Sequence, residues 1–154
     1  MVDITTFDQV FEDAAKAWNV DPMLLKAVAL QESPDGKGGV NPRAVSPVGA
    51  QGMLQIMPRT QKDLGVTDPF DPVQAIFAGA KYLSEGLDKE GTPEGALLYY
   101  HGGPGWRDKY GRESAGYVPA VTSHYRALTA ARAAQAPPAA SQAPPAASTA
   151  STTP

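Results

Sequence analysis

The chain has 154 residues, no cysteine and a formal net charge of −3. This length suits one domain of ordinary size. The slightly acidic balance argues against nucleic-acid binding, which usually requires a basic surface, and the lack of cysteine excludes disulfides and thiolate metal sites. An acidic protein can still bind polysaccharide, because neutral sugars are held by hydrogen bonds and stacking.

A first helix is expected over residues 7–18, where apolar residues recur at helical spacing. Thr5 or Thr6 is its expected cap. A second helix should begin at Pro22 with Asp21 as its cap, because an acidic residue followed by proline is typical of a helix start.

The second helix should end close to Glu32, because Pro34 and residues 35–39 (Asp-Gly-Lys-Gly-Gly) interrupt it. Its expected inward stripe consists of Leu24, Leu25 and Val28. Prolines and glycines alternate with valines over residues 41–51, so this segment is expected to hold a short hairpin at most.

Three further helices are predicted. Residues 71–74 (Asp-Pro-Val-Gln) resemble a capping box that opens a helix through about Leu87. Residues 92–94 (Thr-Pro-Glu) open the next, and the last is expected to reach about Ala131. The inward residues of the first of these three are expected to be Val73, Ile76, Phe77, Ala80 and Leu83.

The composition changes sharply after Arg132, the last charged residue. Only Ala, Pro, Ser, Thr and Gln follow, with residues 135–141 repeated as residues 142–148. Such a stretch has too little apolar surface to offset its ordering entropy. We therefore predict a mainly α domain over residues 1–132 and a disordered Ala/Pro/Ser-rich tail or linker over residues 133–154. A linker or anchor arm and a dispensable tail are equally consistent with this composition.

Glu32 is a candidate general acid for glycoside cleavage, a reaction that needs a carboxylic acid still protonated near neutral pH. It is expected at the C-terminal end of a helix, where the helix dipole disfavours a negative charge. Partial burial would raise its pKa further. Taken alone, a glutamate near a helix end is more often a solvated surface charge.

Residues 45–58 combine two glycines with two glutamines in a turn-rich stretch. Glycine allows the backbone to approach a ligand closely, and Gln55 offers both a donor and an acceptor to a sugar. The simpler interpretation is a plain loop that leads into a helix.

Four segments resemble, in order, the signatures of the soluble lytic transglycosylases, a family related to goose-type lysozymes. Residues 32–33 match the family's Glu-Ser, and residues 52–58 (Gly-Met-Leu-Gln-Ile-Met-Pro) resemble Gly-Leu-Met-Gln-Ile-Met-Pro. Residues 99–105 (Tyr-Tyr-His-Gly-Gly-Pro-Gly) are similar to Ala-Tyr-Asn-Ala-Gly-Pro-Gly, and residues 113–118 (Glu-Ser-Ala-Gly-Tyr-Val) to Glu-Thr-Arg-Gly-Tyr-Val. The resemblance extends over about residues 18–128.

The resemblance implies a lysozyme-like helical fold and cleavage of the β-1,4 bond between N-acetylmuramic acid and N-acetylglucosamine in peptidoglycan. Glu32 would first protonate the glycosidic oxygen and then remove the proton of the muramoyl 6-hydroxyl, which closes a 1,6-anhydro ring. The N-acetyl group of the substrate would steady the intermediate. One catalytic carboxylate then suffices, with no metal and no cofactor.

The family's substrate-binding roles carry over to four further positions. Ser46 and Gln55 would contact the sugar near the reacting carbon, Tyr100 would hydrogen-bond around Glu32 or the substrate, and Glu113 would line the cleft as a supporting acid. Each has a simpler interpretation. Tyr100 is then a core residue, Glu113 caps the final helix and Ser46 shapes a turn.

Two departures from the family pattern bear on the site. Residues 34–40 insert a glycine-rich piece before Asn41-Pro42, and we expect this insert beside the cleft, where it could alter substrate subsites. His101 replaces the asparagine of the third signature. It either contacts sugar or simply occupies a helix end.

Two other functions stay open. A goose-type muramidase would use the same glutamate with water as acceptor, and Glu113 or Asp35 could supply the extra base. A structural component of a phage particle or secretion apparatus would hold glycan without cutting it. In either assembly, the C-terminal tail could contact a partner.

Residues 1–8 lack the basic start and apolar stretch of a secretory signal. The sequence also has no run of about 20 apolar residues, so we expect no helix that spans a membrane. An enzyme that acts in the periplasm or cell wall would then be delivered by a phage particle, a secretion system, host lysis or a leader absent from this chain.

Overall fold

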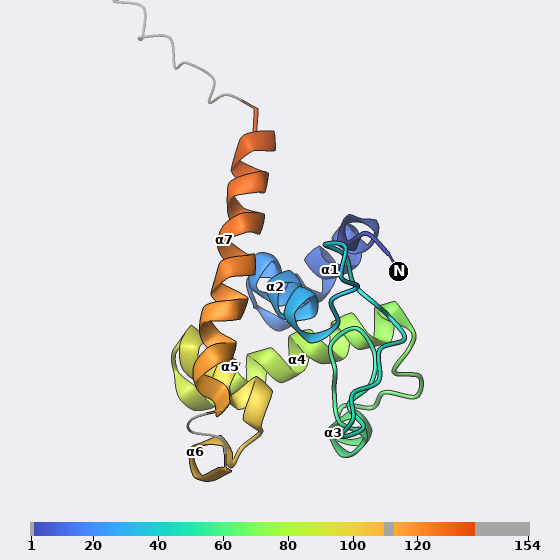
Figure 1. Cartoon of the computed structure of the whole chain (residues 1–154), viewed down its shortest axis with the longest axis vertical. Helices are drawn as coiled ribbons and strands as arrows, with labels where there is room; N and C mark the ends of the chain where they lie inside the picture. The colour runs from blue at the N-terminus through green and yellow to red at the C-terminus, as the bar shows by residue number, and fades with distance from the viewer. Residues whose placement is uncertain (1, 110–112, 138–154) are drawn as a thin grey trace, which may run out of the picture.

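The computed structural model describes residues 2–109 and 113–137, and their architecture is mainly helical (Figure 1). The elements in chain order are η1 (Ile4–Phe7), α1 (Asp8–Trp18), α2 (Pro22–Glu32), α3 (Pro58–Asp63), α4 (Pro72–Glu90), α5 (Pro93–Gly102), α6 (Trp106–Lys109), η2 (Glu113–Gly116) and α7 (Tyr117–Gln135). Strand pairing in the described residues consists of isolated bridges, such as those of Gln51 with Val45 and Ile56. This agrees with the expectation of a short hairpin at most.

The helices pack around one apolar core. α4 packs against α1 and α5, and α2 packs against α7, which runs along one side of the domain (Figure 1). The largest fully buried apolar side chains are Phe11, Leu25, Val28, Val40, Met53, Leu54, Ile76, Leu83 and Val121. The loop between α2 and α3 therefore contributes to the core through Met53 and Leu54. None of the described helices is both long and apolar enough to span a membrane.

Two helices that open with a capping residue followed by proline begin where the sequence predicts them. Asp21 accepts a hydrogen bond from Met23 N at 2.8 Å, and Thr92 accepts one from Gly95 N at 3.1 Å. The first helix begins differently. Asp3 caps a 3-10 turn by accepting from Thr5 N, so neither Thr5 nor Thr6 is the cap.

The start of α4 is not the capping box that the sequence suggests. The Asp71 side chain accepts a hydrogen bond from Val73 N. The side-chain Oε1 of Gln74, however, accepts from the backbone N–H groups of Thr67 and Asp68 in the preceding loop. Val73 is also 49% exposed, although it was expected to face inward. It stands in the first turn of the helix, ahead of the part that packs on the core.

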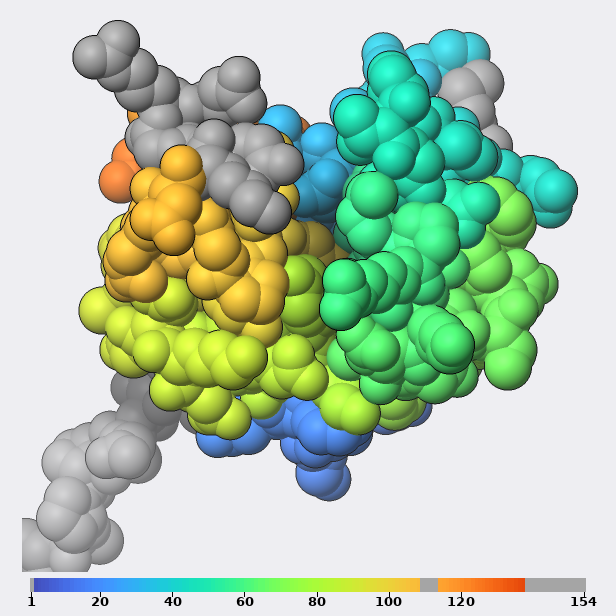
Figure 2. Space-filling model, turned by 90° about the horizontal axis from the view of Figure 1, so that it is seen from below, coloured from blue at the N-terminus to red at the C-terminus, as the bar shows by residue number. Residues whose placement is uncertain are grey.

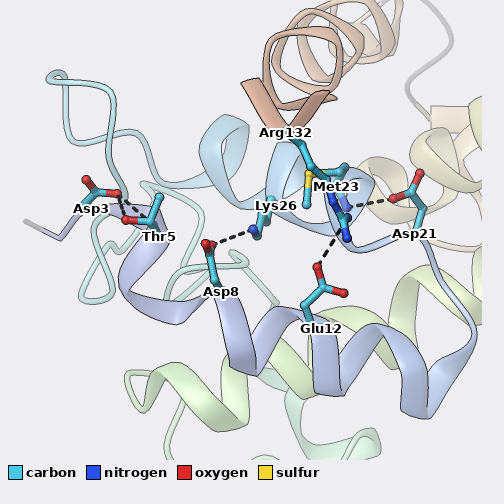
Figure 3. Close-up of polar contacts among 8 residues, drawn as sticks. All are labelled: Asp3, Thr5, Asp8, Glu12, Asp21, Met23, Lys26 and Arg132. Atoms are coloured by element: carbon cyan, nitrogen blue, oxygen red, sulfur yellow. Dashed lines mark hydrogen bonds and ion pairs between the residues drawn. The ribbon is translucent and has the colours of Figure 1, made fainter. Parts of the chain in front are cut away.

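Two ion pairs join α1 to α2 and to α7 (Figure 3). Lys26 of α2 is buried and pairs with Asp8 at 2.6 Å, and Arg132 of α7 pairs with Glu12 at 3.5 Å. α7 continues three residues past Arg132, because Ala and Gln favour helix and the chain reaches its first tail proline only at residue 137.

Candidate active site

Glu32 is the last residue of α2, where the helix ends at Ser33. Its carboxyl group lies half-buried at the domain surface. The hydroxyl of Tyr117, the first residue of α7, donates a hydrogen bond to Glu32 Oε1 at 2.6 Å. The packing of α7 on α2 thus brings together two side chains that are 85 positions apart.

The carboxyl group of Glu32 is poised to exchange a proton near neutral pH. Burial raises the pKa of Glu32 from 4.5 to about 7, and the hydrogen bond from Tyr117 opposes part of that rise. Burial and the neighbouring Glu32 also raise the pKa of the Tyr117 hydroxyl well above its usual range. Tyr117 therefore stays protonated and acts as the donor.

Glu32 opens onto a cleft of about 450 Å³. Ser46, Gln55 and Tyr100 line the same cleft, so the structure brings four of the five predicted site residues together. The other lining residues are Val48, Ala50, Ile56, Met57, Thr60, Tyr82, His101, Gly102, Gly103 and Pro104. Figure 2 shows the hollow between the teal-to-green loop and α3 on one side and the yellow-to-orange α5 and α6 on the other.

The side-chain amide of Gln55 fixes this residue by hydrogen bonds to the backbone of the same loop. Its Nε2 donates to the carbonyl oxygens of Ala44 at 3.1 Å and Gly52 at 2.9 Å, and its backbone has a left-handed φ of 49°. A non-glycine residue in this region requires such support. No described residue donates to its Oε1, which leaves this oxygen available to a ligand donor.

Tyr100 does not bond to Glu32. Its hydroxyl donates to the carbonyl oxygen of Leu54 at 2.9 Å, and its ring packs on Tyr82 with centroids 5.1 Å apart. Tyr100 is buried as well as lining the cleft, so it combines the core position and the site position that the sequence left as alternatives. The hydroxyl contact to Glu32 comes from Tyr117 instead.

Ser33 and Ser46 both stabilise the loop. Ser33 is buried and donates to the carbonyl oxygen of Met53 at 2.8 Å. Ser46 Oγ accepts from Ala50 N at 3.0 Å, which closes the turn at the cleft edge. Ser46 therefore shapes a turn while it lines the cleft.

Two predicted positions lie apart from this arrangement. Glu113 begins η2, but its side chain lies outside the described part of the structure, so its role stays a prediction. Asp35 lies with Val2, Asp3 and residues 37–39 around a separate hollow. Its Oδ1 accepts from Lys37 N and Gly39 N, which hold its pKa below the usual value.

Residues 34–40 are not among the described residues that line the cleft, so an effect of the insert on substrate subsites stays a prediction. Val40 pairs with Val2 through reciprocal backbone hydrogen bonds of 3.0 and 3.1 Å. This pairing ties residues 34–40 to the N-terminal segment. The end of the insert also stays linked to the end of α2, because Asn41 N donates to the carbonyl oxygen of Ser33 at 2.8 Å.

Sequence reasoning missed Tyr117 and left His101 without a role. Tyr117 stands in the fourth signature, so the signal was present, but the role went to Glu113 in the same segment. The imidazole of His101 stacks on the Tyr117 ring with centroids 4.3 Å apart and an interplanar angle of 22°.

Comparison with known proteins gives a consistent picture. The family model for the transglycosylase SLT domain matches residues 9–118. The transglycosylase of Enterobacteria phage PRD1 is 48% identical over 90 residues, which cover 58% of this chain and 32% of that protein. Membrane-bound lytic murein transglycosylase F of Pectobacterium atrosepticum is 34% identical over 110 residues, covering 64% of this chain and 22% of that protein.

Among solved structures, lytic transglycosylase Slt of Pseudomonas aeruginosa matches with a TM-score of 0.67 and 25% identity, covering 84% of this chain and 25% of that one. The chain thus spans a third or less of the length of these relatives. The structural match confirms the expected lysozyme-like helical fold. Because the family model covers more than half of the sequence, the chain belongs to the transglycosylase SLT domain family.

Proposed function

We propose that this protein is a peptidoglycan lytic transglycosylase with Glu32 as its catalytic acid and base. The observation that carries the proposal is the position of Glu32 in the cleft with a pKa of about 7. At neutral pH such a group is present in both protonation states, as a residue needs when it must first give and then take a proton. Family membership supports the same reaction.

The hydrogen bond from Tyr117 defines which oxygen reacts. Because Oε1 of Glu32 accepts from Tyr117, the proton of the neutral acid is carried by Oε2. Oε2 donates this proton to the glycosidic oxygen as the bond from that oxygen to C1 of N-acetylmuramic acid breaks. The resulting carboxylate retains the Tyr117 donor, which stabilises the new charge.

The same carboxylate completes the reaction. It accepts the proton of the muramoyl 6-hydroxyl while the oxygen of that hydroxyl forms a bond to C1, which gives the 1,6-anhydro product and returns Glu32 to its neutral form. No water is consumed. A hydrolase would favour a second base, and Glu32 is the only carboxylate among the described residues that line the cleft.

The other cleft residues would bind the glycan. Gln55 Oε1 would accept from an amide or hydroxyl of the sugar, and Ser46 and Tyr100 would border the sugar next to the reacting bond. Glu113 would be a supporting acid at the same cleft. The enzyme would then act in the periplasm or cell wall, where its substrate lies. The match to a phage transglycosylase supports delivery of the enzyme by a phage particle over a secretion system or host lysis.

The domain organisation is part of the proposal. Residues 1–132 would form the catalytic domain. Residues 133–154, of which the first three still belong to α7, would act as a linker to a partner in a virion or secretion machine.

Mass spectrometry of the soluble fragments released from purified peptidoglycan tests the reaction. We expect muropeptides one water lighter than hydrolysis products, and none with Glu32→Gln, which removes the acidic proton at nearly constant volume. An inactive glutamate-to-glutamine mutant is the form of the Pseudomonas enzyme that was solved, which supports this choice.

Asp35→Asn is the matched control, because Asp35 lies at a separate hollow and should not affect cleavage. Fragments with ordinary reducing ends would identify a muramidase instead. Cleavage by Glu32→Gln would refute the assignment of the acid. A folded protein that binds peptidoglycan and releases no fragments would indicate a structural role.

A further inference from the structure

His101 is the one cleft residue whose type departs from the family signature and whose contact leads to the catalytic acid. It lies in the last turn of α5, lines the cleft and stacks on the ring of Tyr117 at a centroid distance of 4.3 Å. The hydroxyl of Tyr117 in turn donates to Glu32 at 2.6 Å. The family's asparagine at this position has no ring face to offer.

Tyr117 belongs to the buried core with 6% of its surface exposed, and the imidazole of His101 stacks on its ring. Tyr117 is the first residue of α7. Its hydroxyl must reach across to another helix, so a small rotation about the Cα–Cβ bond would displace it from Glu32 Oε1. An aromatic face packed nearly parallel to the ring restricts that rotation.

We propose that His101 is a positioning residue whose imidazole face holds the Tyr117 ring so that its hydroxyl stays on Glu32. This inference rests on the proposed function of Glu32. It concerns the ring face of His101. The consequence for the reaction is that His101 sets how firmly the Tyr117 donor stabilises the ionised form of Glu32.

The direction of the effect follows from the hydrogen bond. The donor from Tyr117 lowers the pKa of Glu32 against the effect of burial. If the ring of Tyr117 becomes loose, this donor is lost part of the time and the pKa of Glu32 rises. Activity that requires ionised Glu32 in the second step then begins only at higher pH.

Carbon-13 NMR titration of the Glu32 carboxyl group tests the inference without any turnover, with Glu32→Gln used to assign the signal. Tyr117→Phe sets the full effect of losing the donor, an upward shift of about one unit or more. We expect His101→Ala and His101→Asn to shift the titration in the same direction. His101→Phe keeps a ring face and should titrate like the wild type.

Steady-state kinetics gives a second readout. We expect His101→Ala to lower kcat about tenfold with KM changed less than about twofold, and His101→Phe to restore most of the rate. A raised KM with unchanged kcat would mean that His101 only contacts sugar, and would overturn the proposal. It would also be overturned if His101→Ala left the Glu32 titration unchanged, or if His101→Phe behaved like His101→Ala.

The two proposals fail in different ways. If peptidoglycan is not cleaved by the wild type, the proposed function fails, whereas the titration still reports whether His101 acts through Tyr117. If cleavage occurs and the titration is the same in all His101 variants, the positioning role alone is wrong. Circular dichroism of each variant checks that it is folded, which we expect because His101 is exposed.

Discussion

Burial of Glu32 should make the folded protein less stable at alkaline pH, and Glu32→Gln should remove this cost. The pKa of Glu32 rises from 4.5 to about 7 on folding. A raised pKa means that its contribution to stability is fully present below the unfolded value and is lost as pH rises through the folded value. The shift corresponds to a loss of about 3 kcal/mol above the folded pKa.

Glutamine is the suitable replacement because it cannot ionise and its side-chain oxygen can still accept from Tyr117. The free energy of unfolding should therefore be measured by urea denaturation of both proteins at about pH 5 and about pH 8.5. The difference in favour of Glu32→Gln should grow by about 2–3 kcal/mol between these pH values. Other titrating groups are common to both proteins and cancel in the comparison. A difference that does not change with pH would refute the buried, elevated pKa of Glu32.

Two further predictions concern the ion pairs of α1 and the C-terminal tail. Asp8→Asn should lower the free energy of unfolding by about 1–2 kcal/mol, because Lys26 is buried and loses its charged partner while Asp8 itself is half-exposed. Glu12→Gln, which breaks an exposed ion pair, should change it by about 0.5 kcal/mol or less, and equal effects in urea denaturation would contradict this reasoning. Deletion of residues 136–154, which leaves α7 intact, should keep the rate of cleavage of isolated peptidoglycan within about twofold. A large loss in a turbidity assay would mean that the tail helps to bind glycan.

The parts of the fold that could be predicted are those with local causes. The helices that begin at Pro22, Pro72 and Pro93 form as expected, since a cap and a proline act within one turn. The position of Glu32 at a helix end was predictable for the same reason, because the proline and glycines after it stop the helix.

The parts that could not be predicted depend on packing between distant segments. The contact of Tyr117 with Glu32 arises from the docking of α7 on α2, and no local pattern reports that geometry. The exposure of Val73 is similar, because helical periodicity alone does not tell where along a helix the core begins. The pairing of Val40 with Val2 could not be predicted either, because the first two helices separate these residues in the sequence.

The family signatures act on the cleft partly by shaping its wall. Ser33 from the first signature and Tyr100 from the third each donate to a carbonyl oxygen of the loop that contains the second signature, at Met53 and Leu54. Once these carbonyl groups are paired, the loop can be buried next to Glu32 without leaving unsatisfied acceptors. Burial is also the largest cause of the raised pKa of Glu32. A structural role and a position in the cleft are therefore not alternatives, because Tyr100 lines the cleft while its hydroxyl completes the packing of the loop.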